Sequence, residues 1–231
     1  MNLQVRSLSL RYPKSANYVF QNLSARMETP GFNALFGPSG VGKTSLARMI
    51  TGDLKPEAGE IRAEGMQILL YSYNLERLPG WSSVSRHLSR VTPTGREALR
   101  HSLIEDFGLQ DCIHQRFAEL SLGQRNRVNL LRYLLQDFDL LIMDESLANV
   151  DELTREKIIL RIKDIFPDAF FLYISHNVVE VSKFCNHILV MPGGDSRQPA
   201  TVVQGRDLRR GRRIDKKQLD RTMLEIVNAS G

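Results

Sequence analysis

The stretch GPSGVGKT, residues 37 to 44, constrains the fold of this chain more than any other feature. It fits the pattern G-x-x-x-x-G-K-[ST] at every fixed position. An apolar stretch that resembles a β-strand, GFNALFG, precedes it, and a stretch with helical character, TSLARMITG, follows it. A strand, a glycine-rich loop and a helix in this order are typical of a phosphate-binding loop. A glycine-rich turn that matches the pattern by chance is the alternative, and the flanking elements disfavour it.

The residue types of this loop suit the binding of a nucleotide. Gly40 and Gly42 let the backbone bend so that its N–H groups face phosphate oxygens, and the following helix adds its positive N-terminal end. Lys43 is expected to reach the β- and γ-phosphates, and Thr44 is expected to offer its hydroxyl to Mg²⁺. The loop therefore predicts a nucleotide site with a metal ion.

Strand-like and helix-like stretches alternate along the rest of the chain, which predicts an α/β fold. Buried strands are expected at residues 140–143, 169–175 and 187–191, and an amphipathic helix is expected from Glu152 to Pro167. Residues 84–107 are predicted to be helical with a break at 93–95, a helix is predicted from Val128, and residues 60–73 are predicted to form a hairpin-like pair of strands.

The strand at residues 140–143 ends in two adjacent acids, Asp144 and Glu145. Burial of carboxylates without a partner is costly, and a Mg²⁺ ion beside a triphosphate would supply the missing positive charge. Asp144 is expected to hold that ion, and Glu145 is expected to polarise an attacking water as a general base. A solvent-exposed turn would be the preferred interpretation of these two acids if the chain lacked the phosphate-binding loop.

Composition indicates an ordinary globular chain. The 231 residues are 42% hydrophobic and 25% charged, which suits one sizeable core. No apolar run approaches the length of a membrane span, and the N-terminus lacks a signal-peptide pattern. Cys112 and Cys185 have no metal-site spacing and are expected to be free thiols in a reducing compartment.

The net charge of +5 is concentrated in RDLRRGRRIDKKQLDR, residues 206–221, which contains eight basic and three acidic side chains. Such a segment can bind anionic lipid or nucleic acid. A solvated C-terminal tail is the simpler interpretation, and it is the one we favour from the sequence.

Four further stretches narrow the class of protein. LSLGQRNRV, residues 120–128, resembles the LSGGQ signature of ATP-binding cassette (ABC) proteins. ESLANVD, residues 145–151, resembles the Walker B glutamate and D-loop of that family, and YISH, residues 173–176, resembles its switch histidine. Tyr12 lies where the family has an aromatic residue that stacks on adenine. The motifs occur in the family's order and cover nearly the whole chain.

The resemblance implies a P-loop NTPase with a RecA-like core and mixed sheet, a small antiparallel β subdomain and a short α-helical signature subdomain. It implies an ATPase that works as a head-to-tail pair, with each ATP between the phosphate loop of one copy and the signature of the other. Glu145, His176 and Lys43 would be catalytic, and Thr44 and Asp144 would hold Mg²⁺. ATP would contact Tyr12, Gly37, Pro38, Ser39, Gly40, Val41, Gly42, Lys43, Thr44, Ser45, Ser121, Gly123, Gln124 and Asp151. Tyr12 and His176 also have purely structural interpretations.

Two departures from the family pattern matter. Leu122 stands where the signature usually has glycine, so that the site could be slower. The glutamine of the Q-loop, which ligates Mg²⁺ and links the site to the transmembrane partner, is missing from LLYSYNLERLPGW, residues 69–81. Tyr73 is closest to that position, with Ser72 and Asn74 as competitors.

The motif LPGW resembles the L-P-W of nitrate-, sulfonate- and taurine-type importer ATPases. Its Trp81 is either a residue of the groove that receives a membrane subunit or a core residue of the helical subdomain.

We therefore expect an ATPase core at 1–71 and 137–205, a helical subdomain at 72–136 and a basic tail at 206–231. The expected partners are transmembrane permease subunits, a second copy or a related ATPase subunit, and, indirectly, a solute-binding protein. The expected location is peripheral, on the cytoplasmic face of the cell membrane, and no nucleic-acid partner is expected. The alternatives are a cassette ATPase that acts on nucleic acid and a weakly catalytic regulatory subunit.

Overall fold

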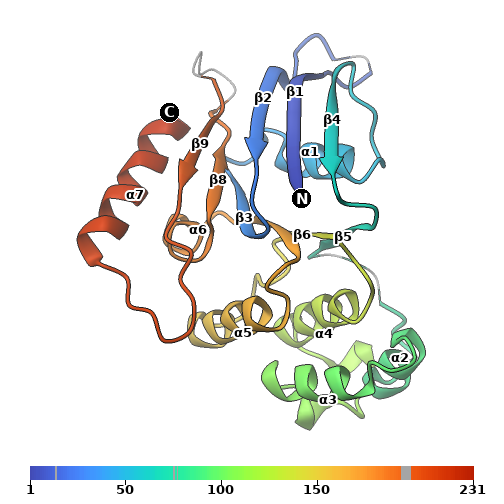
Figure 1. Ribbon diagram of the computed structural model, residues 1–231. Coiled ribbons are helices and arrows are strands. Elements are labelled where there is room, and N and C mark those ends of the chain that lie inside the picture. The colour runs from blue at the N-terminus through green and yellow to red at the C-terminus, as the bar shows by residue number, and fades with distance from the viewer. Residues whose placement is uncertain (14, 75, 77, 194–198) are drawn as a thin grey trace.

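The computed structural model describes residues 1–13, 15–74, 76, 78–193 and 199–231 of the chain. Two sheets organise it (Figure 1). An antiparallel sheet has the order β2 (Phe20–Met27), β1 (Asn2–Leu10) and β4 (Ala58–Glu64). The larger sheet has the order β5 (Leu69–Tyr73), β6 (Leu140–Asp144), β7 (Phe170–Ile174), β3 (Gly31–Phe36), β8 (His187–Val190) and β9 (Thr201–Gln204). Its strands are parallel except β9, which pairs antiparallel with β8.

Seven α-helices accompany the sheets in the part of the chain that the structure describes, and α2 and α3 lie at the end of the molecule away from the antiparallel sheet (Figure 1). Two short 3₁₀ turns, Gln110–Cys112 and Phe117–Glu119, follow α3. The helices are α1 (Lys43–Ile50), α2 (Val84–Val91), α3 (Glu97–Asp106), α4 (Leu122–Leu134), α5 (Glu152–Ile165), α6 (Val178–Phe184) and α7 (Lys216–Ser230). No helix within the described ranges has the combined length and apolar character that a membrane crossing needs.

The central strands are covered on both faces, which explains their continuous apolar sequence. Every residue of β6 and β7 is buried. Leu141 and Phe171 belong to a core shared with α4 and α5, whereas Leu140 and Phe170 belong to a second core shared with α1 and the antiparallel sheet. The predicted α/β class, the buried strands and the helices at 84–107 and 152–165 are confirmed.

The predicted hairpin at residues 60–73 is wrong, because its two strands belong to different sheets. β4 pairs with β1, whereas β5 runs parallel to β6. Asp139 explains the separation: its carboxylate accepts hydrogen bonds from the N–H groups of Gln67 and Ile68, at 2.7 and 2.9 Å. These bonds fix the start of β5 against the start of β6.

The helix that is predicted from Val128 begins earlier, at Leu122. Ser121 is the reason, since its hydroxyl accepts a hydrogen bond from the N–H of Gln124 while the Gln124 side chain accepts one from the N–H of Ser121. This reciprocal pair is a capping box, and it starts a helix at the residue that follows the serine.

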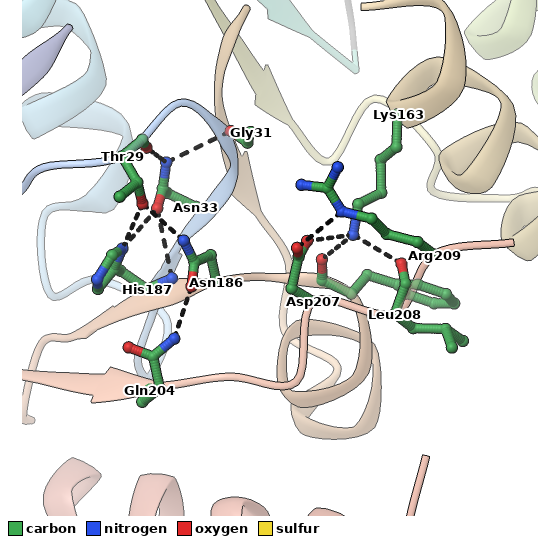
Figure 2. A network of polar contacts seen from close by, with 11 residues as sticks. Thr29, Gly31, Asn33, Lys163, Asn186, His187, Gln204, Asp207, Leu208 and Arg209 are labelled. Carbon is green, nitrogen blue, oxygen red and sulfur yellow. Dashed lines mark hydrogen bonds and ion pairs between the residues drawn. The ribbon is translucent and has the colours of Figure 1, made fainter. Parts of the chain in front are cut away.

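The interpretation of residues 206–231 as a solvated tail is wrong. Helix α7 packs against α6 and the edge strand β9, and it buries Thr222 and Ile226. Arg206 donates to the hydroxyl of Thr222, at 2.6 Å. The segment before the helix is tied to the core by Lys163, whose ammonium lies 2.6 Å from a carboxylate oxygen of Asp207 (Figure 2).

Lys163 also donates to the carbonyls of Phe184 and Leu208, at 2.9 and 2.7 Å. Burial lowers the pKa of Lys163, and its bond to Asp207 opposes that shift. Nearby, the buried side chain of Asn33 donates to the carbonyls of Thr29 and Gly31 and accepts from the N–H of His187 (Figure 2). These polar contacts join the start of β3 to β8 and the C-terminal segment to the core.

Candidate active site

The predicted phosphate-binding loop lies between β3 and α1, at the carboxyl ends of the parallel strands. Gly40 and Gly42 have left-handed φ angles of 86° and 98°, as the expected bend requires. A side chain at Gly42 would also meet Val19 at 2.6 Å, and one at Gly37 would meet the carbonyl oxygen of Met191 at 2.3 Å. At positions 37 and 42, glycine is therefore required for space as well as for its positive φ angle.

Lys43 is folded back over this loop. Its ammonium donates to the carbonyls of Gly37 and Pro38, at 2.8 and 2.7 Å, and the residue is only 6% exposed. Burial lowers the pKa of Lys43, and the carboxylates of Asp144 and Glu145 oppose that shift. The positive charge is thus held inside the bend of the loop, where phosphate oxygens are expected.

Asp144, at the end of β6, is buried and accepts two hydrogen bonds on one carboxylate oxygen. The Thr44 hydroxyl donates to Oδ2 at 2.8 Å, and the Tyr71 hydroxyl donates to the same oxygen at 2.7 Å. Burial, followed by the bond to Asp144, raises the pKa of Tyr71. The phenol therefore keeps its proton at neutral pH and donates a hydrogen bond to Asp144.

The oxygen groups of Thr44 and Asp144 fit Mg²⁺. This ion prefers hard oxygen ligands, and in nucleotide sites it binds one or two protein groups together with substrate phosphates. Within the described ranges, no cluster of three or more His, Cys, Asp or Glu side chains could hold a metal by itself. A site of this composition depends on the nucleotide to complete the metal coordination.

Glu145 and His176 form a pair at the carboxyl ends of β6 and β7. The Nε2 atom of His176 lies 2.7 Å from Oε1 of Glu145, and both side chains are partly exposed. Glu145 has a left-handed φ of 50°, which is uncommon for a residue with a side chain. Its N–H donates to the carbonyl of Ile174 at 3.1 Å, which holds this turn against β7.

One cavity, of about 270 Å³, brings most of the predicted residues together. The phenol of Tyr12 forms a 2.8 Å hydrogen bond with the hydroxyl of Ser45. The cavity is lined by Tyr12, Val19, Ser39, Gly40, Gly42, Lys43, Thr44, Ser45, Asp144, Glu145 and His176.

The signature residues Ser121, Gly123 and Gln124 do not line this cavity. They form the first turn of α4, where Ser121 and Gln124 cap the helix. A side chain at Gly123 would lie 2.4 Å from the carbonyl oxygen of Asn149, so this glycine permits close packing on the segment that follows Glu145. The signature therefore forms a surface apart from the phosphate loop of its own chain.

Asp151 also lies outside the lining of the cavity. It is the N-cap of α5, and its carboxylate accepts a hydrogen bond from the N–H of Thr154 at 2.9 Å. This bond lowers the pKa of Asp151. Within one copy of the chain its contacts are those of a helix cap.

Trp81 is 83% exposed, so the interpretation of this residue as part of the core is wrong. Its neighbours Leu78 and Gly80 line a groove of about 500 Å³. The groove is also lined by Asn74, Glu76, Phe117, Ala118, Leu122, Arg125, Asn126, Asn129 and Asn149. The unusual signature residue Leu122, which is 60% exposed, thus belongs to the wall of the groove.

None of the three candidates for the missing glutamine lines the cavity. Ser72 is buried and accepts a hydrogen bond from the Ser146 hydroxyl, Tyr73 is 42% exposed, and Asn74 lines the groove. Leu75 and Arg77 of the same stretch lie outside the described residues. The contact with Asp144 comes from Tyr71 instead, a residue that the sequence analysis missed; its place on the strand beside Asp144 was the available signal.

The fold and the site together define a P-loop nucleoside triphosphatase. The carboxyl ends of the parallel strands hold a glycine-rich loop, a lysine, the oxygen groups of Thr44 and Asp144, and a glutamate–histidine pair.

Comparison with known proteins identifies the family. Residues 20–148 match the ABC transporter family. An aliphatic sulfonates import ATP-binding protein of Albidiferax ferrireducens is 30% identical over 96% of this chain and 83% of its own length. The chain belongs to the ABC transporter family and is an ATP-binding, ATP-hydrolysing member of it.

Two further relatives are also import ATP-binding proteins, and a solved structure shares the fold. A taurine import ATP-binding protein of Jannaschia sp. is 31% identical over 82% of this chain and 77% of its own length. A molybdenum import ATP-binding protein of Brucella suis is 32% identical over 71% of this chain, and the match spans 51% of that relative. An ABC transporter ATP-binding protein from Pyrococcus furiosus has the same fold, with a TM-score of 0.67 and 24% identity over 77% of this chain and 92% of its own.

Proposed function

We propose that this chain is the subunit that hydrolyses ATP to drive a membrane importer, and that it works as a pair of copies around ATP. The observation that carries the proposal is the single cavity in which the phosphate loop, Asp144, Glu145 and His176 meet. The names of the sulfonate, taurine and molybdenum relatives favour import over export.

In this proposal the residues of the cavity have distinct roles. Lys43 and the loop N–H groups bind the phosphates, and Thr44 and Asp144 hold Mg²⁺. The bound ion would neutralise charge on the phosphate oxygens. Glu145 accepts a proton from the attacking water, and His176, 2.7 Å from it, keeps that carboxylate oriented and contacts the γ-phosphate.

Tyr12 is proposed to stack on the adenine base. It lines the cavity, is 42% exposed, and is held by its bond to Ser45, the residue that follows Thr44. An exposed aromatic ring fixed beside a phosphate loop offers a flat apolar surface to a base.

The pairing of two copies follows from the place of the signature. Ser121, Gly123 and Gln124 begin a helix, and a helix N-terminus with a serine suits a phosphate, yet they lie outside the cavity of their own chain. A second copy, or a related ATPase subunit, would bring its signature to the γ-phosphate, and Asp151 of the D-loop would lie near that junction. ATP would then join the two copies, and its hydrolysis would release them.

Transmembrane permease subunits are the proposed partners, with a solute-binding protein acting through them. The groove beside Trp81 has an apolar and polar lining and an exposed aromatic residue at its edge, features that suit a docking helix. The chain would thus lie peripherally on the cytoplasmic face of the membrane. We also propose that the chain has three parts: a core at residues 1–71 and 137–205, a helical subdomain at 72–136 and a C-terminal part at 206–231.

The basic segment gives little support to the alternative of a nucleic-acid ATPase. Arg209 pairs with Asp207 at 2.9 Å, and Arg210 pairs with Asp164 at 3.2 Å. Part of the positive charge is therefore already paired, and the pair with Asp164 joins the segment to α5.

The test is the substitution Glu145→Gln, with Glu97→Gln, an exposed residue of α3, as the matched control. ATP hydrolysis by Glu145→Gln should fall by about 100-fold or more, because a general base is lost. This variant should also retain ATP and Mg²⁺ and elute as a dimer in light-scattering chromatography, whereas Glu97→Gln behaves as the parent. A parent chain that neither hydrolyses nor retains ATP would refute the proposal.

The same experiments must distinguish the proposed ATPase subunit from a regulatory subunit. It would bind ATP without hydrolysis in the parent, and Leu122→Gly would restore the hydrolysis. If Leu122→Gly leaves the rate and the pairing unchanged, the leucine is harmless to the signature.

A further inference from the structure

The hydroxyl of Tyr71 occupies a position that the family motifs do not predict. Tyr71 lies on the edge strand β5, opposite Ile142 of β6 in the parallel register, and its phenol reaches along the sheet to Asp144. It donates to Oδ2 at 2.7 Å, and the Thr44 hydroxyl donates to the same atom at 2.8 Å. Two donors from two elements therefore converge on one carboxylate oxygen.

These contacts have a consequence for the carboxylate. Two donors on one oxygen restrict rotation of the carboxylate about its side-chain torsion more than a single donor does. Thr44 is at the start of α1 and Tyr71 is on β5, so the two donors that hold the carboxylate come from separate elements. A phenol is a donor at neutral pH, and an ionised carboxylate can only accept, so the direction of the bond is determined.

The neighbouring residues do not offer an equivalent contact. The hydroxyl of Ser72 is within 3.0 Å of that of Ser146, and the ring of Tyr73, which lies 5.6 Å from the ring of Tyr71, is partly exposed. Of these residues, Tyr71 makes the phenol contact with Asp144. The chain thus offers two tyrosines on one strand, one bonded to the Mg²⁺ residue and one beside it.

We propose that Tyr71 is a positioning residue that orients the Asp144 carboxylate for Mg²⁺, an inference that rests on the proposed function. The Thr44 hydroxyl can ligate a cation through its oxygen while it donates its proton to Asp144, and Tyr71 keeps the carboxylate in place throughout. Partners of a metal-binding carboxylate contribute to metal affinity although they do not touch the metal. Tyr71 is a partner of this kind for Asp144.

The experiment compares Tyr71→Phe with Tyr73→Phe, since each removes one phenol oxygen from the same strand. Both are made in the Glu145→Gln chain, so that ATP is bound without hydrolysis. Mn²⁺ serves as a spectroscopic probe of the metal site, and its free concentration is followed by electron paramagnetic resonance in the presence of ATP. Affinity for ATP in EDTA is measured separately, together with the melting temperature.

Tyr71→Phe should raise the Mn²⁺ concentration at half saturation by about 10-fold, the lower end of the effect of such partners, and Tyr73→Phe should leave it unchanged. Affinity for ATP in EDTA should change by less than about 2-fold in both variants, because neither tyrosine lines the cavity.

Equal metal affinity in the two variants would overturn the inference. A parallel loss of ATP affinity in EDTA, of metal affinity and of melting temperature in Tyr71→Phe would also overturn it, because it would indicate a structural role alone. A different result bears on the proposed function itself: the Glu145→Gln chain, with both tyrosines intact, would bind ATP no better with the metal than in EDTA. The two failures are therefore distinguishable.

Discussion

Gly123 allows a prediction in which the space around one atom decides the outcome. A methyl group at this position would lie 2.4 Å from the carbonyl oxygen of Asn149, whereas a carbon and an oxygen in contact lie roughly 3.3 Å apart. The segment or the helix must therefore move by roughly 1 Å. Asn149 resists this movement, because it has a left-handed φ of 61° and the preceding carbonyl, of Ala148, accepts a 2.6 Å bond from Asn126 of α4.

The substitution Gly123→Ala combines two effects of opposite sign. Overpacking of this kind costs about 1–3 kcal/mol. Alanine recovers up to about 1 kcal/mol through its higher helix propensity, and less in a first turn. The net loss is about 1–2 kcal/mol, which lowers the melting temperature of a chain this long by about 2–8 °C.

The assay is thermal unfolding without nucleotide, with Leu122→Ala as the matched control. Leu122 is the preceding residue and is 60% exposed, so its truncation should change stability by less than about 0.5 kcal/mol. If Gly123→Ala melts at the temperature of Leu122→Ala, the segment after Glu145 adapts freely and the contact with Asn149 does not require glycine.

Three further predictions concern contacts outside the cavity. Lys163→Met removes the partner of Asp207 and of two buried carbonyls, so it should lower the free energy of unfolding in urea by about 2–3 kcal/mol. Lys157→Met, on the exposed side of the same helix, should leave that free energy unchanged. Equal free energies of unfolding for the two variants would contradict the role of the buried ammonium. The two backbone N–H groups that bind Asp139 lower its pKa, so its contribution to stability is present above the unfolded-state pKa and is lost as pH falls through the lower folded-state pKa. Asp139→Asn should therefore be less stable than the parent at pH 7 and should lose less stability below about pH 4. Parallel pH profiles of the two chains would refute this. Trp81→Ser should leave the melting temperature within about 2 °C, because an 83% exposed ring contributes little to folding, and a larger loss would show that the ring is packed.

The sequence predicted those parts of the fold that depend on local patterns. The phosphate loop needs a strand, glycines at set spacing and a helix, all within about 20 consecutive residues. The buried strands at β6 and β7 have continuous apolar sequences because both faces are covered. Each of these features can be recognised without knowledge of its neighbours in space.

The errors concern contacts between distant segments. The separation of β4 from β5 depends on Asp139, more than 60 residues further along the chain. The basic C-terminal segment was predicted to be solvated because its charge is high, yet the ammonium of Lys163 and the buried face of α7 hold it to the core. Charge composition describes the exposed side of a segment and gives no information about a periodic buried side.

In the candidate site, too, local motifs predicted some residues, whereas a contact between distant segments was missed. Motif order identified Lys43, Asp144, Glu145 and His176, and the cavity brings these residues together. The register between β5 and β6, which no motif encodes, brings Tyr71 to Asp144.

The stretch that lacks the glutamine therefore contacts the candidate site through a strand residue rather than through the loop. Tyr73, the residue closest to the position of the missing glutamine, is partly exposed and does not line the cavity, and its neighbour Asn74 lines the groove proposed for the membrane subunit. In this chain the orientation of Asp144 is thus separated from the groove, because Tyr71 is fixed in the sheet. Substitutions at Asn74 should then alter the response of ATP hydrolysis to the membrane subunit while the hydrolysis of the isolated chain stays within about 2-fold of the parent, since a loop residue outside the cavity contributes little to the chemical step. If Asn74→Ala slows the isolated chain as strongly as Tyr71→Phe does, the loop still contributes to the metal site and this separation is incorrect.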